Sequence, residues 1–410
     1  MYDAIIVGAR CAGSSTAMLL ARRGFKVLLL DRATFPSDTI STHILWPHGA
    51  EILARWGLLQ RLASTGAPPI CRRMRFDVGP FALHGTIPDA NDGRGGFCPR
   101  RTVLDALLVN AAVESGAEVR EGFAVEELLV ADDIVVGIRG HSKGTKSIAE
   151  RARIVIGADG VNSFVAQAVR AREYDVRPIA ACAYYSYLSG VRQDDIELYV
   201  RDRIALGGSP TNDGLHLLMV NWPAREFTTV RGDVEGHVWR ALETAPDFLA
   251  RMREGRREEK WYGTAGVPGY FRKPYGTGWA LVGDASYNRD PITAQGISDA
   301  FIDAETLVEA LSEGLSGNGV FDDRLAAHEL ARNERVRPMY EFTTHLAALE
   351  PPPPDMQALF GALRGNEDAT NAFLSAITGA IPLPDFMSTE NIGRIMAAAN
   401  EAETSSARTT

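Results

Sequence analysis

The first 31 residues alternate between apolar runs and helical spacing. Residues 2–7 form a short apolar run that ends in glycine, and residues 25–30 form a second run that ends in Asp31. Between them, residues 14–23 show the spacing of a helix and stop at Gly24. Two buried strands joined by a helix predict a βαβ unit, which implies a parallel sheet and an α/β fold.

The next stretch changes from helical spacing to short strand-like runs. Residues 49–62 predict a short amphipathic helix, and residues 103–115 predict another one. Thr102 and Asp105 have the spacing of a capping box at the start of the second helix. Residues 117–156 contain four strand-like runs separated by tight turns, which predict an antiparallel meander that ends in a buried strand.

A second region of strands follows, and the chain then becomes helical. Residues 179–230 are rich in tyrosine and partly alternating, so they predict a mixed or antiparallel sheet separate from the parallel one. Residues 234–259 predict a charged helical stretch, and residues 280–282 predict a last buried strand. The remainder predicts helices, and residues 401–410 predict a disordered tail.

Composition and charge narrow the possible partners. The 410 residues allow two or three domains, with 43 Lys and Arg against 52 Asp and Glu, a net charge of −9. That balance argues against nucleic acid as an electrostatic partner. No apolar run is long enough to span a bilayer, and the first residues lack the features of a signal peptide. We therefore expect a soluble, cytoplasmic protein, and the sequence leaves its oligomeric state open.

The four cysteines do not indicate a metal site or a disulfide framework. Cys11, Cys71, Cys98 and Cys182 are widely separated, and the sequence contains no C-x-x-C pair. A structural zinc site therefore needs ligands that this spacing does not supply. We expect reduced cysteines and no bound metal.

A glycine-containing turn joins the first strand to the first helix. Gly8 and Gly13 occupy the first and third glycine positions of a dinucleotide-binding turn, where they allow a tight turn and close packing of helix on strand. Arg10 stands at the second position. It could turn away and leave the backbone in contact with a phosphate, or it could pair with a phosphate or a substrate anion. Asp31 ends the second strand, where an acid can accept hydrogen bonds from a ribose.

Two more strand ends carry an acid beside glycine. Asp159 and Gly160 follow one buried strand, and Asp284 follows the last one. Gly296 then begins an amphipathic helix. Ligands of open α/β sheets bind at the carboxyl ends of the strands, so we expect these positions to share one crevice.

In combination these blocks resemble the FAD-dependent monooxygenases of the aromatic-hydroxylase type, which are related to geranylgeranyl-type reductases and flavin-dependent halogenases. The resemblance covers residues 1–340. It rests on the N-terminal βαβ unit, on the segment 101–105 that opens a helix, on the Asp-Gly segment 159–160 and on the segment 283–296.

The resemblance implies an FAD site, an electron donor and a reaction. NADH or NADPH would reduce FAD, and reduced FAD would react with O2 to a C4a-hydroperoxide that oxygenates an aromatic or polyketide-like small molecule. An alternative implied by the same relatives is a reductase that saturates carbon–carbon double bonds. A halogenase is disfavoured because the W-x-W-x-I-P block is absent, and residues 221–223 do not satisfy it. The cofactor-binding positions implied are Gly8, Arg10, Ala12, Gly13, Asp31, Arg32, Arg101, Val125, Asp159, Asp284, Pro291, Gly296 and Ile297.

The resemblance implies a specific role for several of these positions. Arg32 would cover the adenine and Val125 would contact it through its backbone. Asp284 would bind the ribityl chain, and residues 291–297 would pass beside the isoalloxazine ring, with the helix at Gly296 stabilising negative charge on the reduced ring. One departure concerns the electron donor: Ala166 follows Val165 where the family has arginine, which puts direct reduction by bound NAD(P)H in doubt. Arg170 lies one helical turn later and could take the place of that arginine.

The catalytic candidates lie on the predicted sheet and in the loop before residue 49. Tyr185 shares one strand face with Ala183 and Tyr187, whereas Cys182, Tyr184 and Ser186 share the other, and either face could line a pocket. His216 lies on a neighbouring run. His43 and His48 lie near the expected flavin edge, where a histidine could act as a general base. We select His48, Tyr185 and His216 as catalytic candidates.

The expected architecture is a Rossmann-like FAD-binding domain with a parallel sheet and an antiparallel meander. A mixed or antiparallel substrate-binding sheet is inserted into it, and a C-terminal helical region follows. The expected boundaries are 1–70, 99–172 and 265–340 for the FAD-binding domain, 71–98 and 173–264 for the substrate-binding domain, 341–400 for the C-terminal helices and 401–410 for the tail.

Overall fold

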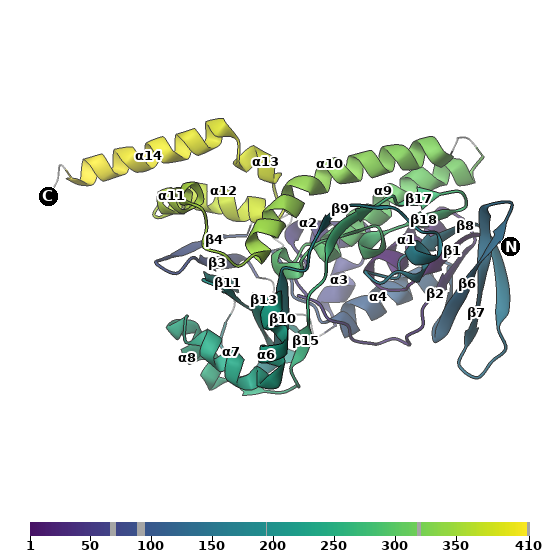
Figure 1. Ribbon diagram of the computed structural model, residues 1–410, viewed down its shortest axis with the longest axis horizontal. Coiled ribbons are helices and arrows are strands. Elements are labelled where there is room, and N and C mark those ends of the chain that lie inside the picture. The colour runs from purple at the N-terminus through teal and green to yellow at the C-terminus, as the bar shows by residue number, and fades with distance from the viewer. Residues whose placement is uncertain (66–70, 88–94, 194, 318–320, 408–410) are drawn as a thin grey trace.

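The computed structural model describes residues 1–65, 71–87, 95–193, 195–317 and 321–407 (Figure 1). Its first sheet has the order β17-β18-β8-β1-β2-β5. The parallel strands are β1 (Tyr2–Val7), β2 (Val27–Leu30), β5 (Glu118–Arg120), β8 (Ile148–Gly157) and β18 (Trp279–Leu281), and β17 (Tyr275–Gly276) joins the edge antiparallel. This confirms the predicted α/β fold.

Alternate residues of β1 point to two different apolar layers. Ala4 and Ile6 pack with α1 (Cys11–Arg22), α4 (Arg101–Glu114) and α9 (Gly296–Leu315). Ile5 and Val7 pack on the other side, against the meander of β6 (Phe123–Ala131) and β7 (Ile134–Ser142) and against α5 (Phe164–Ala168). Both faces of the parallel sheet are therefore covered, which explains its unbroken apolar runs.

The second sheet is mixed and has the order β14-β10-β13-β12-β11-β3-β4, with β15 paired to β10. All its pairs are antiparallel except β11 with β3. The bounds are β3 (Arg73–Asp77), β4 (Ala82–Thr86), β10 (Ala181–Ser189), β11 (Ile196–Arg201), β12 (Ile204–Pro210), β13 (His216–Pro223), β14 (Arg256–Arg257) and β15 (Tyr262–Thr264). The predicted mixed or antiparallel sheet is confirmed.

The two faces of this sheet have different neighbours. Tyr184 packs in one apolar cluster with α6 (Phe227–Gly232), α7 (Val234–Leu242) and α8 (Pro246–Glu254). Tyr185 and Tyr187 lie on the opposite face, beside Leu217 and Met219 of the paired strand β13. The structure thus decides which tyrosines face away from these three helices.

A third, small sheet joins β9 (Glu173–Arg177), β16 (Gly269–Arg272) and β19 (Tyr287–Asn288). The long helix α10 (Phe321–Ala347) crosses from the parallel sheet to the region of β3, β4 and β11, and the last helix leads away from the body of the molecule (Figure 1). The helices that follow are α11 (Pro354–Leu363), α12 (Glu367–Ile377), α13 (Leu383–Phe386) and α14 (Thr389–Ala407), and the short 3-10 turns are η1 (Asn212–Gly214), η2 (Ala224–Glu226), η3 (Gly283–Ala285) and η4 (Pro291–Thr293).

Several predicted helix limits are wrong. The helix predicted over residues 49–62 is two helices, α2 (Pro47–Arg55) and α3 (Leu59–Ala63), because Gly57 adopts φ +79 between them. The stretch 234–259 is likewise divided into α7, α8 and β14. Residues 401–407, expected in a disordered tail, continue α14.

The predicted capping box is also wrong. Helix α4 begins at Arg101, one residue before Thr102, and no side chain caps its first turn. Asp105 instead binds two arginines. A buried carboxylate needs partners that offset its lost hydration, and the two arginines supply them.

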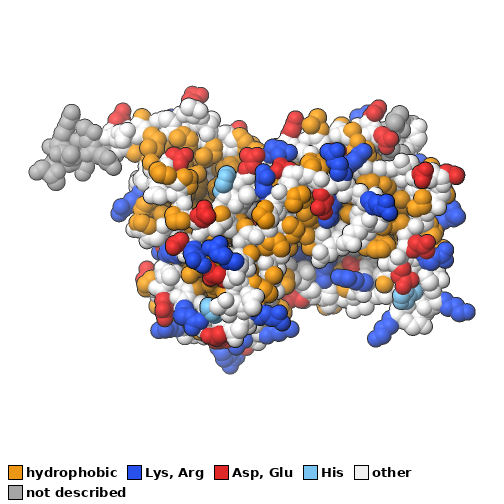
Figure 2. Space-filling model, viewed as in Figure 1, with side chains coloured by type: hydrophobic (Ala, Val, Ile, Leu, Met, Phe, Trp, Pro, Cys, Tyr) orange, Lys and Arg blue, Asp and Glu red, His pale blue; other side chains and the backbone are white. Residues whose placement is uncertain are grey.

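Basic and acidic side chains are interspersed with hydrophobic ones over the face shown in Figure 2. In the part of the chain that the structure describes, no helix is both long and apolar enough to cross a bilayer. Strand β9 was expected in the substrate-binding domain, but it pairs with β16 and not with the mixed sheet. The division into a discontinuous FAD-binding domain and a substrate-binding domain stays a prediction.

Candidate cofactor and substrate site

The turn between β1 and α1 has no room for side chains at its two glycines. Gly8 has φ +104, and a Cβ placed on it would lie 2.4 Å from the carbonyl oxygen of Ala158. A Cβ on Gly13 would lie 1.7 Å from the carbonyl oxygen of Gly8. The helix that follows has no side-chain cap, so its first N–H groups and its dipole face the turn. This arrangement suits an anion such as a pyrophosphate.

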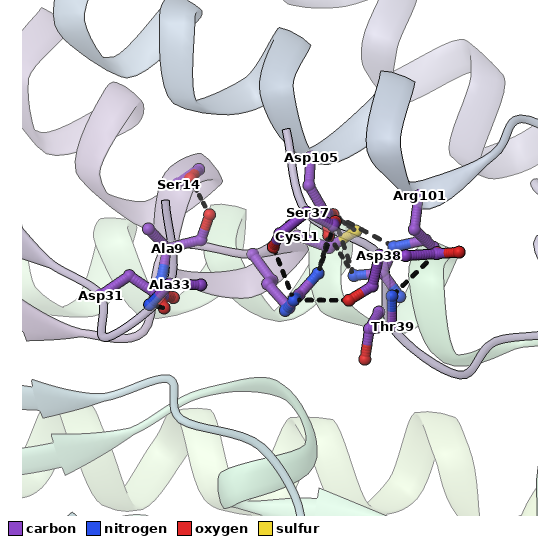
Figure 3. Close-up of polar contacts among 11 residues, drawn as sticks. Ala9, Cys11, Ser14, Asp31, Ala33, Ser37, Asp38, Thr39, Arg101 and Asp105 are labelled. Carbon is purple, nitrogen blue, oxygen red and sulfur yellow. Dashed lines mark hydrogen bonds and ion pairs between the residues drawn. The ribbon is translucent and has the colours of Figure 1, made fainter. Parts of the chain in front are cut away.

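Asp31 holds the same turn from the end of β2. Its Oδ2 accepts a hydrogen bond from the N–H of Ala9 at 2.7 Å, and its Oδ1 accepts one from the N–H of Ala33 at 2.8 Å (Figure 3). Each carboxylate oxygen keeps a second lone pair, which leaves acceptor capacity for a ribose hydroxyl. The following residue, Arg32, is exposed.

Arg10 turns toward a loop and a helix. Its guanidinium is 2.6 Å from Oδ2 of Asp105 and donates to the Ser37 hydroxyl and the Asp38 carbonyl, each at 3.0 Å. It also lies over the ring of Phe35, 5.6 Å from the centroid. Of the roles left open by the sequence, the structure shows a pairing with a carboxylate of the protein, which joins the glycine turn to the loop after β2.

Asp105 is shared between two cations (Figure 3). It is fully buried, and Arg101 of the same helix donates to it at 2.9 Å and 3.1 Å. Burial raises the pKa of the neighbouring Cys11 thiol to about 12, so this cysteine stays protonated near its carboxylate partner. Two guanidinium groups against one carboxylate leave a positive excess beside the glycine turn.

Asp284 lies at the carboxyl end of β18, close to the same turn. Gly283 approaches α1 so closely that a Cβ on it would be 2.7 Å from the Cβ of Ala12. The Asp284 side chain is exposed, yet surrounding protein raises its pKa to about 6 through desolvation, against the lowering effect of Arg101. The carboxylate is therefore accessible to a ligand beside the glycine turn, and its ribityl-binding role stays a prediction.

The segment before α9 leaves its first helical residue open. Ala294 has φ +55, a left-handed conformation that is unusual for alanine and that turns the chain into the helix. Gly296 is exposed, and a Cβ on it would meet nothing within 4 Å. Pro291 is half-buried and Ile297 is buried. The open helix end can therefore stabilise negative charge placed against it.

Asp159 and Val125 have contacts that account for their positions without a cofactor. Asp159 accepts hydrogen bonds from the Ser163 hydroxyl at 2.5 Å and from the Val165 N–H at 3.1 Å, and it thereby holds the start of α5. Val125 is half-buried in β6, opposite Gly140 of β7. Their cofactor roles stay predictions.

An apolar cavity lies between the mixed sheet, the segment before α9 and the C-terminal helices. The empty space between its wall atoms, which includes open solvent, is about 710 Å³. Strands β3, β11, β12 and β13 form one side, and Ile292, Thr293 and Ala294 form another. Apolar side chains make up most of its wall: Ile44, Trp46, Met74, Phe76, Ile196, Leu198, Leu217, Met219, Ile292, Ala294, Phe342, Leu346 and Ile377.

A buried histidine and two tyrosines lie behind one end of this cavity. His43 adopts φ +61, is fully buried, and contacts the Tyr187 hydroxyl through Nε2 at 2.5 Å. Its pKa is lowered to about 3 by desolvation and by Arg101 and Arg100, so the imidazole is neutral. Burial raises the pKa of Tyr185 and Tyr187, so both hydroxyls remain protonated. The three side chains are therefore polar and uncharged, and the His43 imidazole is a weak base.

The other two histidines are placed differently. His48, at the start of α2, contacts the C-terminal helices near Thr378, and burial lowers its pKa to about 4. His216 points to the face of the mixed sheet that packs on α8, since its Nε2 lies against Gly208 and Phe248 on that side. It therefore does not line the apolar cavity, and a catalytic role for it there has no structural support.

Comparison with known proteins decides the family. The profile described as "FAD binding domain" matches residues 1–343 of this chain. The chain belongs to this FAD-binding family. It is a flavoprotein and a flavin-dependent oxidoreductase, as the sequence predicted.

Curated relatives of this chain include digeranylgeranylglycerophospholipid reductases. A digeranylgeranylglycerophospholipid reductase of Methanosarcina mazei is 29% identical over 338 residues, which covers 78% of this chain and 77% of that protein. One from Methanococcoides burtonii is also 29% identical, over 337 residues, which covers 76% of each chain.

Solved structures share the fold at low identity. The flavin-dependent brominase Bmp2 superposes with a TM-score of 0.80 at 19% identity, covering 98% of this chain and 99% of that one. The myxobacterial chondrochloren halogenase CndH gives 0.78 at 22% identity, covering 97% and 96%. PqsL of Pseudomonas aeruginosa, a probable FAD-dependent monooxygenase, gives 0.70 at 19%, covering 91% and 99%.

The residues around the glycine turn fit FAD. The turn has no side chains at Gly8 and Gly13, no side chain caps the first N–H groups of α1, and the Asp284 carboxylate beside the turn is exposed. We propose that these groups hold the pyrophosphate and the ribityl chain, with the ring beside Gly296. Arg10 would act indirectly, through its contacts with the loop after β2.

The sequence did not predict the ion pair between Arg10 and Asp105 or the contact between His43 and Tyr187. The Asp105 spacing suggested a helix cap, and only the approach of α4 to the turn shows its ion pairs. His43 gave a weak signal, as one of three histidines considered. Its left-handed backbone and its contact with a strand 144 residues away cannot be inferred from local sequence.

Proposed function

We propose that this flavoenzyme is a monooxygenase of a neutral aromatic or polyketide-like small molecule, with NADH or NADPH as reductant and O2 as oxidant. The observation that carries the proposal is the position of the apolar cavity, which is walled by Ile292, Thr293 and Ala294 directly before the open end of α9. Substrate in the cavity would lie next to the expected flavin ring. The overall reaction converts NAD(P)H, a proton, O2 and substrate into NAD(P)+, water and the hydroxylated product.

The wall of the cavity supports a neutral substrate. The carboxylate of Glu197 is hydrogen-bonded to Tyr199 and Arg251, toward α8 and away from the cavity. Burying a charge without a partner is costly, so a charged substrate would bind weakly among these apolar side chains. The bound FAD would supply the redox chemistry, while the protein excludes water and orients the substrate.

Tyr185 and Tyr187 would form the polar end of the site. Their hydroxyls remain protonated, and His43 holds that of Tyr187 in place through a short hydrogen bond. Each hydroxyl has one donor proton and an acceptor oxygen, so this end suits a carbonyl or phenol oxygen. Arg100 lies over the Tyr187 ring, 4.3 Å from its centroid, and packs against it.

The names of the sequence relatives favour a second candidate, a reductase of carbon–carbon double bonds. Such a reductase would transfer two electrons and two protons to an alkene without O2. The same apolar cavity could hold a hydrocarbon chain, so the requirement for O2 distinguishes the two candidates.

The experiment measures O2 uptake and product with FAD-loaded protein, NADH or NADPH and a set of phenols and polyphenols. We expect substrate-stimulated O2 consumption, with one O2 consumed for each hydroxylated product. Complete turnover of an alkene under anaerobic conditions would instead establish the reductase. Protein that stays colourless after addition of FAD would contradict both candidates.

A pair of tyrosine variants tests the polar end. Tyr187→Phe is expected to lower the rate of product formation about tenfold with little loss of bound flavin, because it removes one hydrogen bond of about 1–1.5 kcal/mol. Tyr184→Phe is the matched control, since Tyr184 lies on the opposite face of the same strand. Equal rates for both variants would remove Tyr187 from the site.

A further inference from the structure

The part of the chain beyond the family match contributes a wall of the apolar cavity. The match ends at residue 343, whereas Leu346 of α10 and Ile377 at the end of α12 line the cavity. Together with Phe342 they lie opposite the strands of the mixed sheet. A wall outside the shared domain is where relatives with the same cofactor site can differ in what they bind.

The turn after α12 touches the cavity and the segment before α9 at once. The Gln295 side chain, itself buried, donates through Nε2 to the Ile377 carbonyl at 3.0 Å. Gly379 has φ +78, and a Cβ on it would lie 2.8 Å from His48 and 3.3 Å from Gln295. The turn is therefore held tightly against the residue that precedes Gly296. Ile377 is 6% exposed and lines the cavity.

We infer that the turn Ile377–Gly379 is a specificity-determining wall of the substrate site, and that the Ile377 side chain limits the length of the apolar substrate. This inference rests on the proposed function only for the reaction, since the cavity itself is independent of it. The substrate class is a neutral molecule with one polar end and an apolar tail directed toward the C-terminal helices. Gln295 is a positioning residue that holds the wall.

The chemistry of the wall explains why one side chain can set the limit. Replacing isoleucine by alanine removes three carbons from a surface that is held by backbone and side-chain contacts on its other sides. Because the neighbouring atoms collapse only partly, space of about that size opens in the cavity. Each methylene of a ligand that fills such space contributes about 0.8 kcal/mol, which is about a fourfold gain in affinity.

The test uses 4-alkylphenols of increasing chain length with the FAD-loaded full chain, and measures Kd by calorimetry and O2 uptake in parallel. Affinity of the unaltered protein is expected to rise with chain length and then to fall. In Ile377→Ala the optimum is expected to move two or three methylenes longer, and in Ile377→Trp it is expected to move shorter. The 4-alkylbenzoates, which are charged, are expected to bind at least tenfold more weakly than phenols of equal length.

Ile381→Ala is the matched control, because Ile381 packs on the same C-terminal core without lining the cavity. It should leave the optimum unchanged. Gln295→Leu keeps the volume and removes the hydrogen bond to the Ile377 carbonyl, so it should broaden the length preference.

The outcomes separate the inference from the proposed function. An optimum that is the same in Ile377→Ala as in the unaltered protein, or an absence of binding across the whole series, overturns the inference. Shifted binding without O2 uptake leaves the inference standing and contradicts the oxygenase. O2-dependent turnover with an unshifted optimum supports the oxygenase and contradicts the inference.

Discussion

The glycine turn and the apolar cavity lie in one molecule but are built on opposite principles. Around the turn, charged groups are buried and paired, with Asp105 held between Arg10 and Arg101. Around the cavity, most side chains of the described wall are apolar. The carboxylate among them, Glu197, pairs with Arg251 on the other face of the sheet. The turn can hold an anionic cofactor in a defined place, whereas the cavity accepts ligands by shape.

This difference predicts two kinds of response to mutation. Removing one member of a buried charge pair leaves the partner uncompensated, so the loss is large and abrupt. Changing the size of a cavity side chain alters fit gradually, by steps of one methylene.

The largest effect is expected for Asp105→Ala. Arg101 is only 9% exposed and would lose its carboxylate partner, which should lower the free energy of unfolding by about 3–5 kcal/mol. Urea unfolding measures this loss. Glu114→Ala, which removes an exposed partner of Arg61, is the control and should cost less than about 1 kcal/mol. Similar losses in the two variants would contradict the contrast between buried and exposed pairs.

Gly13→Ala should have the next largest effect. The added Cβ would overlap the carbonyl oxygen of Gly8, and backbone there has to move, at a cost of about 3 kcal/mol. Flavin content and thermal unfolding should both fall. Gly361→Ala, in a helix where a Cβ meets nothing within 4 Å, should leave both unchanged or slightly raise stability. Normal flavin content in Gly13→Ala would contradict the proposed phosphate cradle.

The pH dependence of the free energy of unfolding should report on Asp290, the buried residue that caps η4. Burial raises its pKa to about 6, so between about pH 6 and 4 the folded protein binds this proton more tightly than the unfolded chain. The stabilisation from this proton is therefore gained as pH falls through 6 and lost as pH rises. Lowering the pH from 7 to 4.5 should add about 2 kcal/mol from this group, and Asp290→Asn should remove that increment. If Asp290→Asn shows the same pH dependence of the free energy of unfolding as the unaltered protein, the raised pKa of Asp290 is contradicted.

The smallest effect on stability is expected for Arg10→Ala. Its side chain is 29% exposed and Arg101 still compensates Asp105, so the loss should be about 1 kcal/mol. The loop after β2 should become easier to cleave by proteases, because Ser37 and Asp38 lose their contacts with the guanidinium. Arg10→Lys should restore the charge but only part of the protection. Unchanged cleavage in Arg10→Ala would show that the loop is held by other contacts.

The local sequence pattern was sufficient to predict the features that neighbouring residues of the chain form. The βαβ unit, the need for glycine at positions 8 and 13 and the acid at the end of β2 follow from short segments with defined backbone geometry. Helix limits were less predictable. Gly57 divides one predicted helix into two, and Asp105 was assigned to a cap when its partners lie elsewhere in the fold.

The sequence alone determined that this chain carries a dinucleotide-type turn, a parallel sheet and a second, tyrosine-rich sheet, because strand and helix periods are local properties. Only the tertiary structure decided what Arg10 binds, which face of β10 points toward the cavity, and that His216 points away from it. Those outcomes depend on which surfaces meet. The partner of a buried charge or the lining of a cavity comes from segments that the chain brings together only when it folds.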